Sequence, residues 1–183
     1  MKLYYGTGSC SLLVHIVLEE LGIPFEAVRV DLEAGEHRGA AYRAINAKGK
    51  VPALVTPEGT LTECLAIVEW LADREGTGTL LAKPGTWARA KTMERMATLA
   101  TEVHPLFNRF FHADDFAADG PAQAAVKARG AAKMSAWFAA QDAAFAGPWW
   151  SGAPSPDVTD FYFAVIARWG RWLDPPATRL PAI

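Results

Sequence analysis

Hydrophobic residues near the start of the chain follow first a strand-like and then a helix-like spacing. Residues 2–5 form a short β-favouring run, and residues 6–9 are typical of a turn. A helical pattern then covers residues 10–21 and is followed by Gly22 and Pro24. The glycine permits a left-handed C-cap, and the proline prevents the helix from resuming. This part of the chain is therefore predicted to form a strand and a helix.

A second strand is predicted over residues 25–32, where apolar positions recur with a period of two. A polar stretch at residues 35–39 leads to a short helix near residues 40–45. Two further short β runs, the first at residues 51–55, flank a turn at residues 57–59. A turn of this composition between two β runs predicts a hairpin.

A last helix in this region begins at residues 62–64 and is expected to end at Gly76. Its apolar positions fall on one broad face, made of Leu65, Ile67, Val68, Leu71 and Ala72. The complete order is β-α-β-α-β-β-α. A right-handed crossover, an antiparallel hairpin and a covering helix together cover both faces of a small mixed sheet. This order predicts a thioredoxin-like α/β domain.

The composition changes at residues 76–79 and 83–85, which are rich in glycine. Alanine-rich helical patterns follow, and they predict helices at residues 86–111, with a bend at Pro105, at residues 121–145 and at residues 158–172. We therefore expect a thioredoxin-like domain at residues 1–76, a linker at residues 77–85 and an all-helical domain at residues 86–183.

The charge pattern excludes some classes of partner. The 183 residues include 18 lysines and arginines against 20 aspartates and glutamates, and the basic residues are scattered. Neither nucleic acid nor an anionic membrane is an expected partner. We find no secretory signal pattern and no run of about 18 apolar residues, so a cytoplasmic protein is expected. The two cysteines, Cys10 and Cys64, are expected to be thiols in that compartment.

Cys10 is the first candidate for chemistry. It follows the first strand and begins the first helix, where free N–H groups and the helix dipole favour a thiolate. Hydroxyls of Ser9 and Ser11 are placed to bond to the sulfur. A small buried thiol that only fills space is an equally weighted interpretation. Leu13 occupies the second cysteine position of a C-x-x-C motif, so dithiol chemistry of the thioredoxin kind is not expected.

Two further segments of the first domain are candidates for binding. Val51 and Pro52 precede a strand at the position where thioredoxin-like folds carry a cis-proline, although an ordinary edge-strand proline is the alternative. Sequence does not reveal the isomer. Glu63 and Cys64 begin a helix whose N–H groups are suited to a ligand carboxylate. The simpler interpretation is that Thr62 or Glu63 caps the helix.

His104 is the candidate in the helical domain. It precedes Pro105, and a bend there would aim the imidazole across a cleft between the domains. As an isolated histidine it is more commonly a surface or packing residue. No cluster of histidine, cysteine and carboxylate has metal-ligand spacing, so no metal is expected. The aromatic residues of this domain are expected mainly in the core, with some suited to a pocket for a hydrophobic co-substrate.

Several segments together resemble the bacterial beta-class, or cysteine-type, glutathione S-transferase family. They are Met1-Lys2-Leu3-Tyr4-Tyr5, Ser9-Cys10-Ser11-Leu12, His15, residues 18–22, 35–38 and 46–54, and Thr62-Glu63-Cys64-Leu65-Ala66-Ile67. In the second domain, Thr101-Glu102-Val103-His104 and Asp157-Val158-Thr159-Asp160 also look like family motifs, the latter as an N-cap pattern before an aromatic helix. The resemblance covers nearly all of the first domain.

The resemblance implies a glutathione site with assigned roles. Cys10 would face the glutathione sulfur, Val51 would pair its backbone with the tripeptide, and Glu63 with the Cys64 backbone would hold the γ-glutamyl end. Glu102 and His104 would close the site, with His104 and Cys10 as the catalytic pair. The remaining implied glutathione contacts are Tyr5, Ser9, Ser11, Pro52 and Thr101. Glutathione is thus the expected co-substrate, and a homodimer formed through the helical domain is also implied.

The expected function is conjugation of the glutathione thiolate to hydrophobic electrophiles, as in detoxification. The alternatives are a glutathione-dependent thiol-disulfide oxidoreductase or dehalogenase with Cys10 as covalent nucleophile, and a non-catalytic glutathione-binding stress protein. Three positions depart from the family pattern: Cys64 replaces a serine or glycine, Ala97 replaces an asparagine, and a lysine is missing near Gly35. The helical domain is also expected to lack the last helix of the family.

Overall fold

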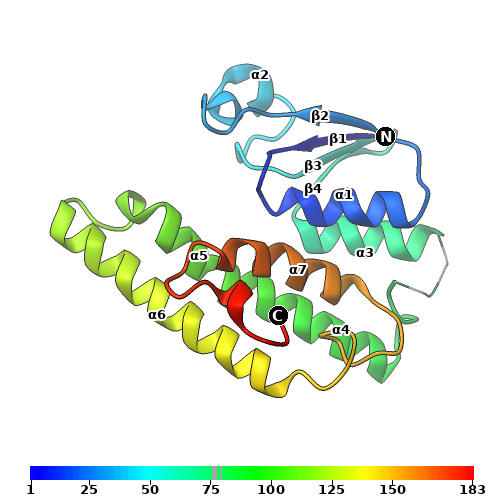
Figure 1. Ribbon diagram of the computed structural model, residues 1–183. Coiled ribbons are helices and arrows are strands. Elements are labelled where there is room, and N and C mark those ends of the chain that lie inside the picture. The colour runs from blue at the N-terminus through cyan, green and yellow to red at the C-terminus, as the bar shows by residue number, and fades with distance from the viewer. Residues whose placement is uncertain (76–77, 79) are drawn as a thin grey trace. The chain divides into compact units, whose positions relative to one another are not determined.

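The computed structural model describes residues 1–75, 78 and 80–183 (Figure 1). The chain divides into two compact units, Met1–Arg89 and Ala90–Ile183. The predicted boundary between residues 76 and 77, and the predicted helix end at Gly76, lie outside the described residues.

The first unit has the predicted thioredoxin-like order of elements. They are β1 (Lys2–Tyr5), α1 (Ser11–Glu20), β2 (Glu26–Arg29), α2 (Ala40–Arg43), β3 (Ala53–Thr56), β4 (Gly59–Thr62) and α3 (Cys64–Glu75). A single 3₁₀ turn at Glu36–Arg38 precedes α2. The prediction of β-α-β-α-β-β-α, including the hairpin, is therefore confirmed.

The four strands form one mixed sheet in the order β2-β1-β3-β4. β1 is parallel to β2 and antiparallel to β3, and Leu3 pairs directly with Leu54. Both leucines are fully buried. Helices α1 and α3 lie side by side on one face of the sheet and α2 lies on the other (Figure 1). Tyr4 contacts Tyr42 of α2 edge to face, with ring centroids 5.9 Å apart. This arrangement brings the N-termini of α1 and α3 to the same end of the unit (Figure 1).

β2 is shorter than the strand predicted over residues 25–32. The Val30 N–H still donates to the Tyr5 carbonyl at 2.8 Å, but β1 ends at Tyr5 and offers no further partner. The chain then turns, because the Asp31 carboxylate accepts a hydrogen bond from the Ala34 N–H at 3.0 Å. The alternation of apolar residues over residues 25–32 thus extends past Arg29, where the paired part of the strand ends.

The second unit is helical, as predicted. Its helices are α4 (Trp87–Thr98), which contains the boundary between the units, α5 (His104–Phe111), α6 (Gly120–Ala144) and α7 (Val158–Gly170), with 3₁₀ turns at Ala113–Asp115 and Ala177–Arg179. Asp157 and Asp160 form the predicted N-terminal cap of α7 as a full capping box. The core of this unit includes Leu99, Phe107, Met134, Phe138, Tyr162, Val165 and Ile166. Among the described residues, none of the helices combines the length and apolar character needed to cross a bilayer.

The helix predicted over residues 86–111 is interrupted before Pro105 rather than at it. Residues Leu99–Val103 form a π-helical segment between α4 and α5. Proline has no N–H and crowds the preceding turn, so the regular ladder of hydrogen bonds fails there. The Thr101 hydroxyl donates to the Ala97 carbonyl at 2.9 Å, which satisfies one of the carbonyls in this region. His104 is consequently the first residue of α5.

Candidate functional site

Cys10 lies at the N-cap of α1, directly after the turn that follows β1. It is a free, half-buried thiol. Its Sγ lies 3.8 Å from the carbonyl oxygen of Val51, in hydrogen-bonding geometry. The first N–H groups of α1 donate to oxygens of Ser9 and Cys10, and the positive end of the helix dipole lies beside the sulfur. The prediction that Cys10 lies at the start of a helix is confirmed.

The hydroxyls of Ser9 and Ser11 hold the turn rather than the sulfur. Ser9 Oγ donates to the Gly6 carbonyl at 2.8 Å and lies 2.6 Å from Ser11 Oγ. Ser11 is fully buried and accepts from the Gly6 N–H at 3.1 Å. Gly6 itself has no room for a side chain, since an added Cβ would lie 2.5 Å from the Leu32 side chain. The two serines thus fix the turn that presents Cys10, and the expectation that they bond to its sulfur is corrected.

Cys64 brings a second thiol to the same place. It is the first residue of α3, only 8% exposed, and its Sγ donates to the Cys10 carbonyl oxygen at 3.6 Å. The hydrogen bond from the Cys64 thiol is the largest cause of a lowered pKa of Cys10, and Lys50 also lowers it. The same hydrogen bond, followed by burial, raises the pKa of Cys64 well above the usual value of a thiol. Of the two thiols, Cys10 is therefore the one that ionises more readily.

The peptide bond between Val51 and Pro52 is cis, which decides between the two isomers that sequence left open. Pro52 is buried and precedes β3, while Val51 is half-buried. The loop before them is fixed by the Lys50 carbonyl, which accepts from the Tyr42 hydroxyl at 2.7 Å and from the Asn46 amide at 2.6 Å. The backbone of Val51 is consequently held in place next to Cys10.

Glu63 lies at the start of α3 in an unusual conformation. Its φ is +74°, in the left-handed region that favours glycine. Its carbonyl accepts the first helical hydrogen bond from Ile67 at 3.0 Å, so Glu63 is the residue that begins the helix. Its carboxylate is exposed and bonds to Lys48 Nζ at 2.6 Å, and Lys48 also donates to the Thr62 hydroxyl at 3.1 Å. The predicted binding positions Glu63 and Cys64 therefore stand at the N-terminus of α3, where the first N–H groups have no acceptor within the helix.

Tyr5 is the last residue of β1 and is half-buried. Its ring contacts His15 of α1 edge to face, with centroids 5.7 Å apart. The ring of Tyr5 is thus supported by α1 on one side of the turn that carries Cys10.

The other predicted site residues belong to the second unit. His104 is half-buried, its Nδ1 lies 3.1 Å from the Tyr162 hydroxyl, and its ring packs at 4.9 Å against Trp169. Thr101 and Glu102 lie in the π-helical segment and are exposed. The hydrogen bond to Tyr162 and the ring contact with Trp169, both residues of α7, therefore help to orient the imidazole.

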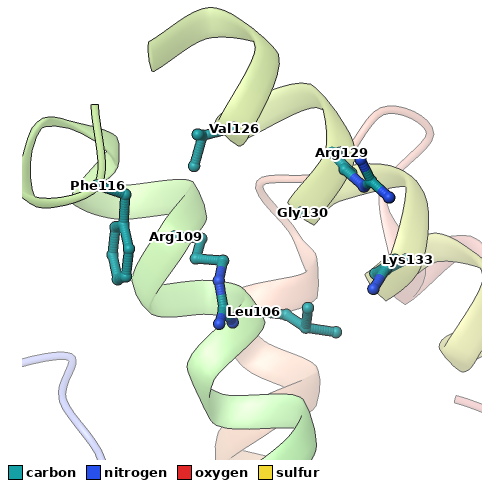
Figure 2. Close-up of a pocket in the computed structure, with 7 residues that line it drawn as sticks. All are labelled: Leu106, Arg109, Phe116, Val126, Arg129, Gly130 and Lys133. Carbon is teal, nitrogen blue, oxygen red and sulfur yellow. The ribbon is translucent and has the colours of Figure 1, made fainter. Parts of the chain in front are cut away.

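The second unit also has a pocket that the sequence analysis did not single out (Figure 2). It has a volume of about 450 Å³ and is lined by Leu106, Arg109, Phe116, Val126, Arg129, Gly130 and Lys133. The lining side chains come from α5, the segment after it, and α6 (Figure 2). The sequence signal for this pocket was the four-residue spacing of Arg129 and Lys133, which places both side chains on one face of α6.

The aromatic residues have mixed positions. Phe107 and Phe138 are buried in the core, as expected, and contact each other edge to face. The default expectation of a core position is wrong for Trp87 and Trp172, which are 80% and 58% exposed, and for Phe111 and Trp149, which are also exposed. In the part of the chain that the structure describes, no group of three or more potential metal-ligating side chains is close enough to hold an ion.

Comparison with protein families and known structures identifies relatives of both units. Residues 7–74 match the family model described as "Glutathione S-transferase, N-terminal domain". Glutathione S-transferase GstA of Escherichia coli O157:H7 is 45% identical over 116 residues, an alignment that covers 62% of this chain and 58% of that protein.

Two solved structures are similar over the whole chain. A sphingomonad glutathione S-transferase complexed with glutathione has a TM-score of 0.85 and 34% identity, and the match covers 100% of this chain and 88% of that one. The bacterial beta class glutathione S-transferase of Sphingomonas chungbukensis has a TM-score of 0.84 and 31% identity, with the same coverage.

Proposed function

Because the chain belongs to the glutathione S-transferase family, we propose that it transfers the thiolate of glutathione to small hydrophobic electrophiles. The observation that carries this proposal is the setting of Cys10. A thiol with a lowered pKa lies at a helix N-terminus, beside the backbone of Val51 and the N-terminus of α3. These features together suit a thiol-containing peptide with a free carboxylate.

Glutathione is proposed to bind along the edge of the first unit. Val51, fixed next to the cis-proline Pro52, offers backbone groups to the tripeptide. The N–H groups that follow Glu63 at the start of α3 suit the carboxylate of the γ-glutamyl end, and the Glu63 carboxylate suits its ammonium group. In this proposal Cys64 contributes its backbone N–H, and Tyr5, Ser9 and Ser11 shape the turn beside the glutathione sulfur.

Cys10 and the N-terminus of α1 are proposed to stabilise negative charge on the glutathione sulfur. The glutathione thiol must lose its proton before it attacks, so any group that stabilises negative charge on a neighbouring sulfur lowers the barrier. Cys10 is proposed to hydrogen-bond to the glutathione sulfur in its thiol form. His104, Glu102 and Thr101 are proposed to act in the same reaction, with His104 as the second catalytic residue.

A second candidate activity is favoured by the lowered pKa of Cys10. The thiolate is the nucleophilic form of cysteine, and a lowered pKa increases its fraction, so Cys10 can form a mixed disulfide with glutathione and act in thiol-disulfide exchange. This activity uses the same glutathione site, and it differs from conjugation in the bond that Cys10 makes.

The proposal also covers the oligomeric state, the cellular location and the biological role of the protein. We propose a homodimer formed through the helical domain, which would cover exposed aromatic residues of the second unit such as Phe111 and Trp172. A cytoplasmic location is proposed because two neighbouring free thiols fit a reducing compartment. Detoxification of electrophiles is the proposed biological role.

Calorimetric titration with glutathione, followed by an assay with a dinitrohalobenzene, tests the leading proposal. Binding and conjugation are the expected results. Absence of both from folded protein would refute it, whereas binding without conjugation across several electrophiles would indicate a binding protein. Light scattering coupled to size-exclusion chromatography measures the proposed dimer.

A further inference from the structure

The two cysteine thiols of this chain form a pair, which is a role not yet assigned to either of them. Cys10 and Cys64 are the two cysteines of the sequence. They are 54 residues apart, yet Cys64 Sγ lies 3.6 Å from the Cys10 carbonyl oxygen. An intramolecular disulfide in this chain therefore has one possible connection, and the Cys64 thiol already lies against the backbone of Cys10.

The two thiols differ in access. Cys10 is half-buried and faces the backbone of Val51, whereas Cys64 is 8% exposed at the start of α3. A dissolved disulfide can reach Cys10 but is kept from Cys64 by the surrounding side chains. The order of reaction is thus set by burial: Cys10 reacts first, and Cys64 reacts only with what is attached to Cys10.

We propose that Cys64 is a resolving thiol, which attacks a mixed disulfide between Cys10 and glutathione and gives this chain a dithiol-disulfide exchange activity with glutathione disulfide. This inference rests on the proposed glutathione site and on the second candidate activity. It assigns a covalent step to Cys64, for which the family resemblance implied only a backbone contact.

The exchange has two balanced steps. In the first, the Cys10 thiolate attacks one sulfur of glutathione disulfide, the Cys10–glutathione bond forms, and one glutathione leaves as a thiolate that takes a proton from solvent. In the second, Cys64 attacks the Cys10 sulfur, the Cys10–Cys64 bond forms, and the second glutathione leaves with the proton that Cys64 has lost. The protein dithiol is oxidised, and glutathione disulfide is reduced to two molecules of glutathione.

The first step also prepares the second. The main cause of the raised pKa of Cys64 is its interaction with Cys10, which favours a protonated Cys64 while Cys10 carries the charge. Once Cys10 is bound in a mixed disulfide it carries no charge, so this opposition to ionisation of Cys64 ends. The negative charge of Glu63 and burial continue to oppose it.

Incubation of the reduced protein with glutathione disulfide, followed by acid quench and intact-mass measurement, tests the inference. The wild type is expected to become lighter by two hydrogen atoms, and peptide mapping is expected to find Cys10 linked to Cys64. Cys64→Ser is expected to accumulate a form heavier by one glutathionyl group, at least about tenfold more abundant than in the wild type. Cys10→Ser is the matched control and is expected to gain no glutathionyl group.

The wild-type peptide map decides the question even if Cys64→Ser does not fold. Accumulation of a mixed disulfide on wild-type Cys10 without a Cys10–Cys64 link would overturn the inference, as would the absence of any reaction. Conjugation to a dinitrohalobenzene is measured on the same wild-type preparation. If conjugation proceeds but the link does not form, the resolving role fails and the proposed transferase function stands.

Discussion

Lys48 places its ammonium nitrogen 2.6 Å from the carboxylate of Glu63, the residue that begins α3 with a φ of +74°. Both side chains are more than half exposed, so the ion pair itself contributes little to stability. The left-handed backbone conformation of Glu63 costs about 1 kcal/mol or more. An unfavourable conformation at a proposed ligand-binding residue indicates that its position serves binding more than folding.

Replacement of Glu63 is expected to separate stability from binding. Glu63→Gly relieves the strain and Glu63→Ala keeps it, so the glycine variant is expected to be more stable than the alanine variant by about 1 kcal/mol. Both variants lack the carboxylate and are expected to bind glutathione more weakly than the wild type. Urea denaturation and calorimetric titration measure the two quantities, and equal stability of the two variants would contradict the strain argument.

The reactivity of Cys10 is expected to depend on Cys64. The rate of alkylation of Cys10 by iodoacetamide follows its thiolate fraction, so its pH midpoint should lie below that of a free cysteine. Cys64→Ala removes the hydrogen bond that chiefly lowers this pKa and is expected to move the midpoint upward. Cys64→Ser keeps a hydrogen-bond donor, so its pH midpoint should lie between those of the wild type and Cys64→Ala. A midpoint unchanged in Cys64→Ala would show that α1 and Lys50 suffice.

Arg89 is expected to be a major source of stability in the first unit. Its side chain is 8% exposed, and the guanidinium donates to both oxygens of Asp73 at 2.8 and 2.9 Å, to Glu69 at 2.7 Å and to the Ala82 carbonyl at 2.9 Å. Arg89→Ala is expected to destabilise the protein by about 2 kcal/mol, less than for a fully buried pair because both carboxylates can be rehydrated. Arg89→Lys cannot reproduce the forked geometry and should recover only part of the loss. Chemical denaturation measures the free energy of unfolding of the wild type, Arg89→Ala and Arg89→Lys.

The contact between Arg89 and Asp73 is expected to make the stability of the protein depend on pH. The hydrogen bond from Arg89 lowers the pKa of Asp73, so the folded state favours the ionised carboxylate. For a lowered acidic pKa, the stabilisation is complete above the unfolded-state value and is lost as pH falls through the folded-state value. The stability advantage of the wild type over Asp73→Asn is therefore expected at neutral pH and should disappear in strong acid. An advantage that persists unchanged in acid would contradict this assignment.

Asp160 supports α7 through two backbone donors. Its carboxylate is 7% exposed and accepts from the Ser151 N–H at 2.8 Å and from the Asp157 N–H at 2.9 Å. Asp160→Ala leaves both donors without an acceptor and is expected to cost about 2 kcal/mol. Asp160→Asn retains one acceptor oxygen and should cost less. Thermal unfolding of the two variants gives this order, and the reverse order would refute it.

Sequence predicted the elements of this chain better than the partners of their side chains. The strand at Lys2–Tyr5 and the capping box at Asp157 are local features, determined by neighbouring residues, and both were found as predicted. The shorter β2 depended on where β1 ends, which no local pattern contains. The hydroxyls of Ser9 and Ser11 are adjacent to Cys10 in sequence, but the tight turn directs them to Gly6.

Long-range contacts were the least predictable. The place of Cys64 beside Cys10 was suggested by family resemblance, and its thiol contact depends on how α1 and α3 pack on the same face of the sheet. The Arg89 cluster joins residues 16 and 20 positions apart and has no sequence signature. The basic pocket around Arg109 arises from packing of α5 on α6 and was not predicted.

The π-helical segment at Leu99–Val103 makes the orientation of His104 depend on how the backbone before it is wound. A π turn contains one residue more than an α turn, so it has the form of a single-residue insertion in a continuous helix. If the same five residues were wound as α-helix, His104 would be rotated by roughly a quarter turn relative to α4. The Tyr162 hydroxyl would then no longer face the imidazole. The winding of one turn is thus enough to set the direction of a histidine, with no change of side chain at all.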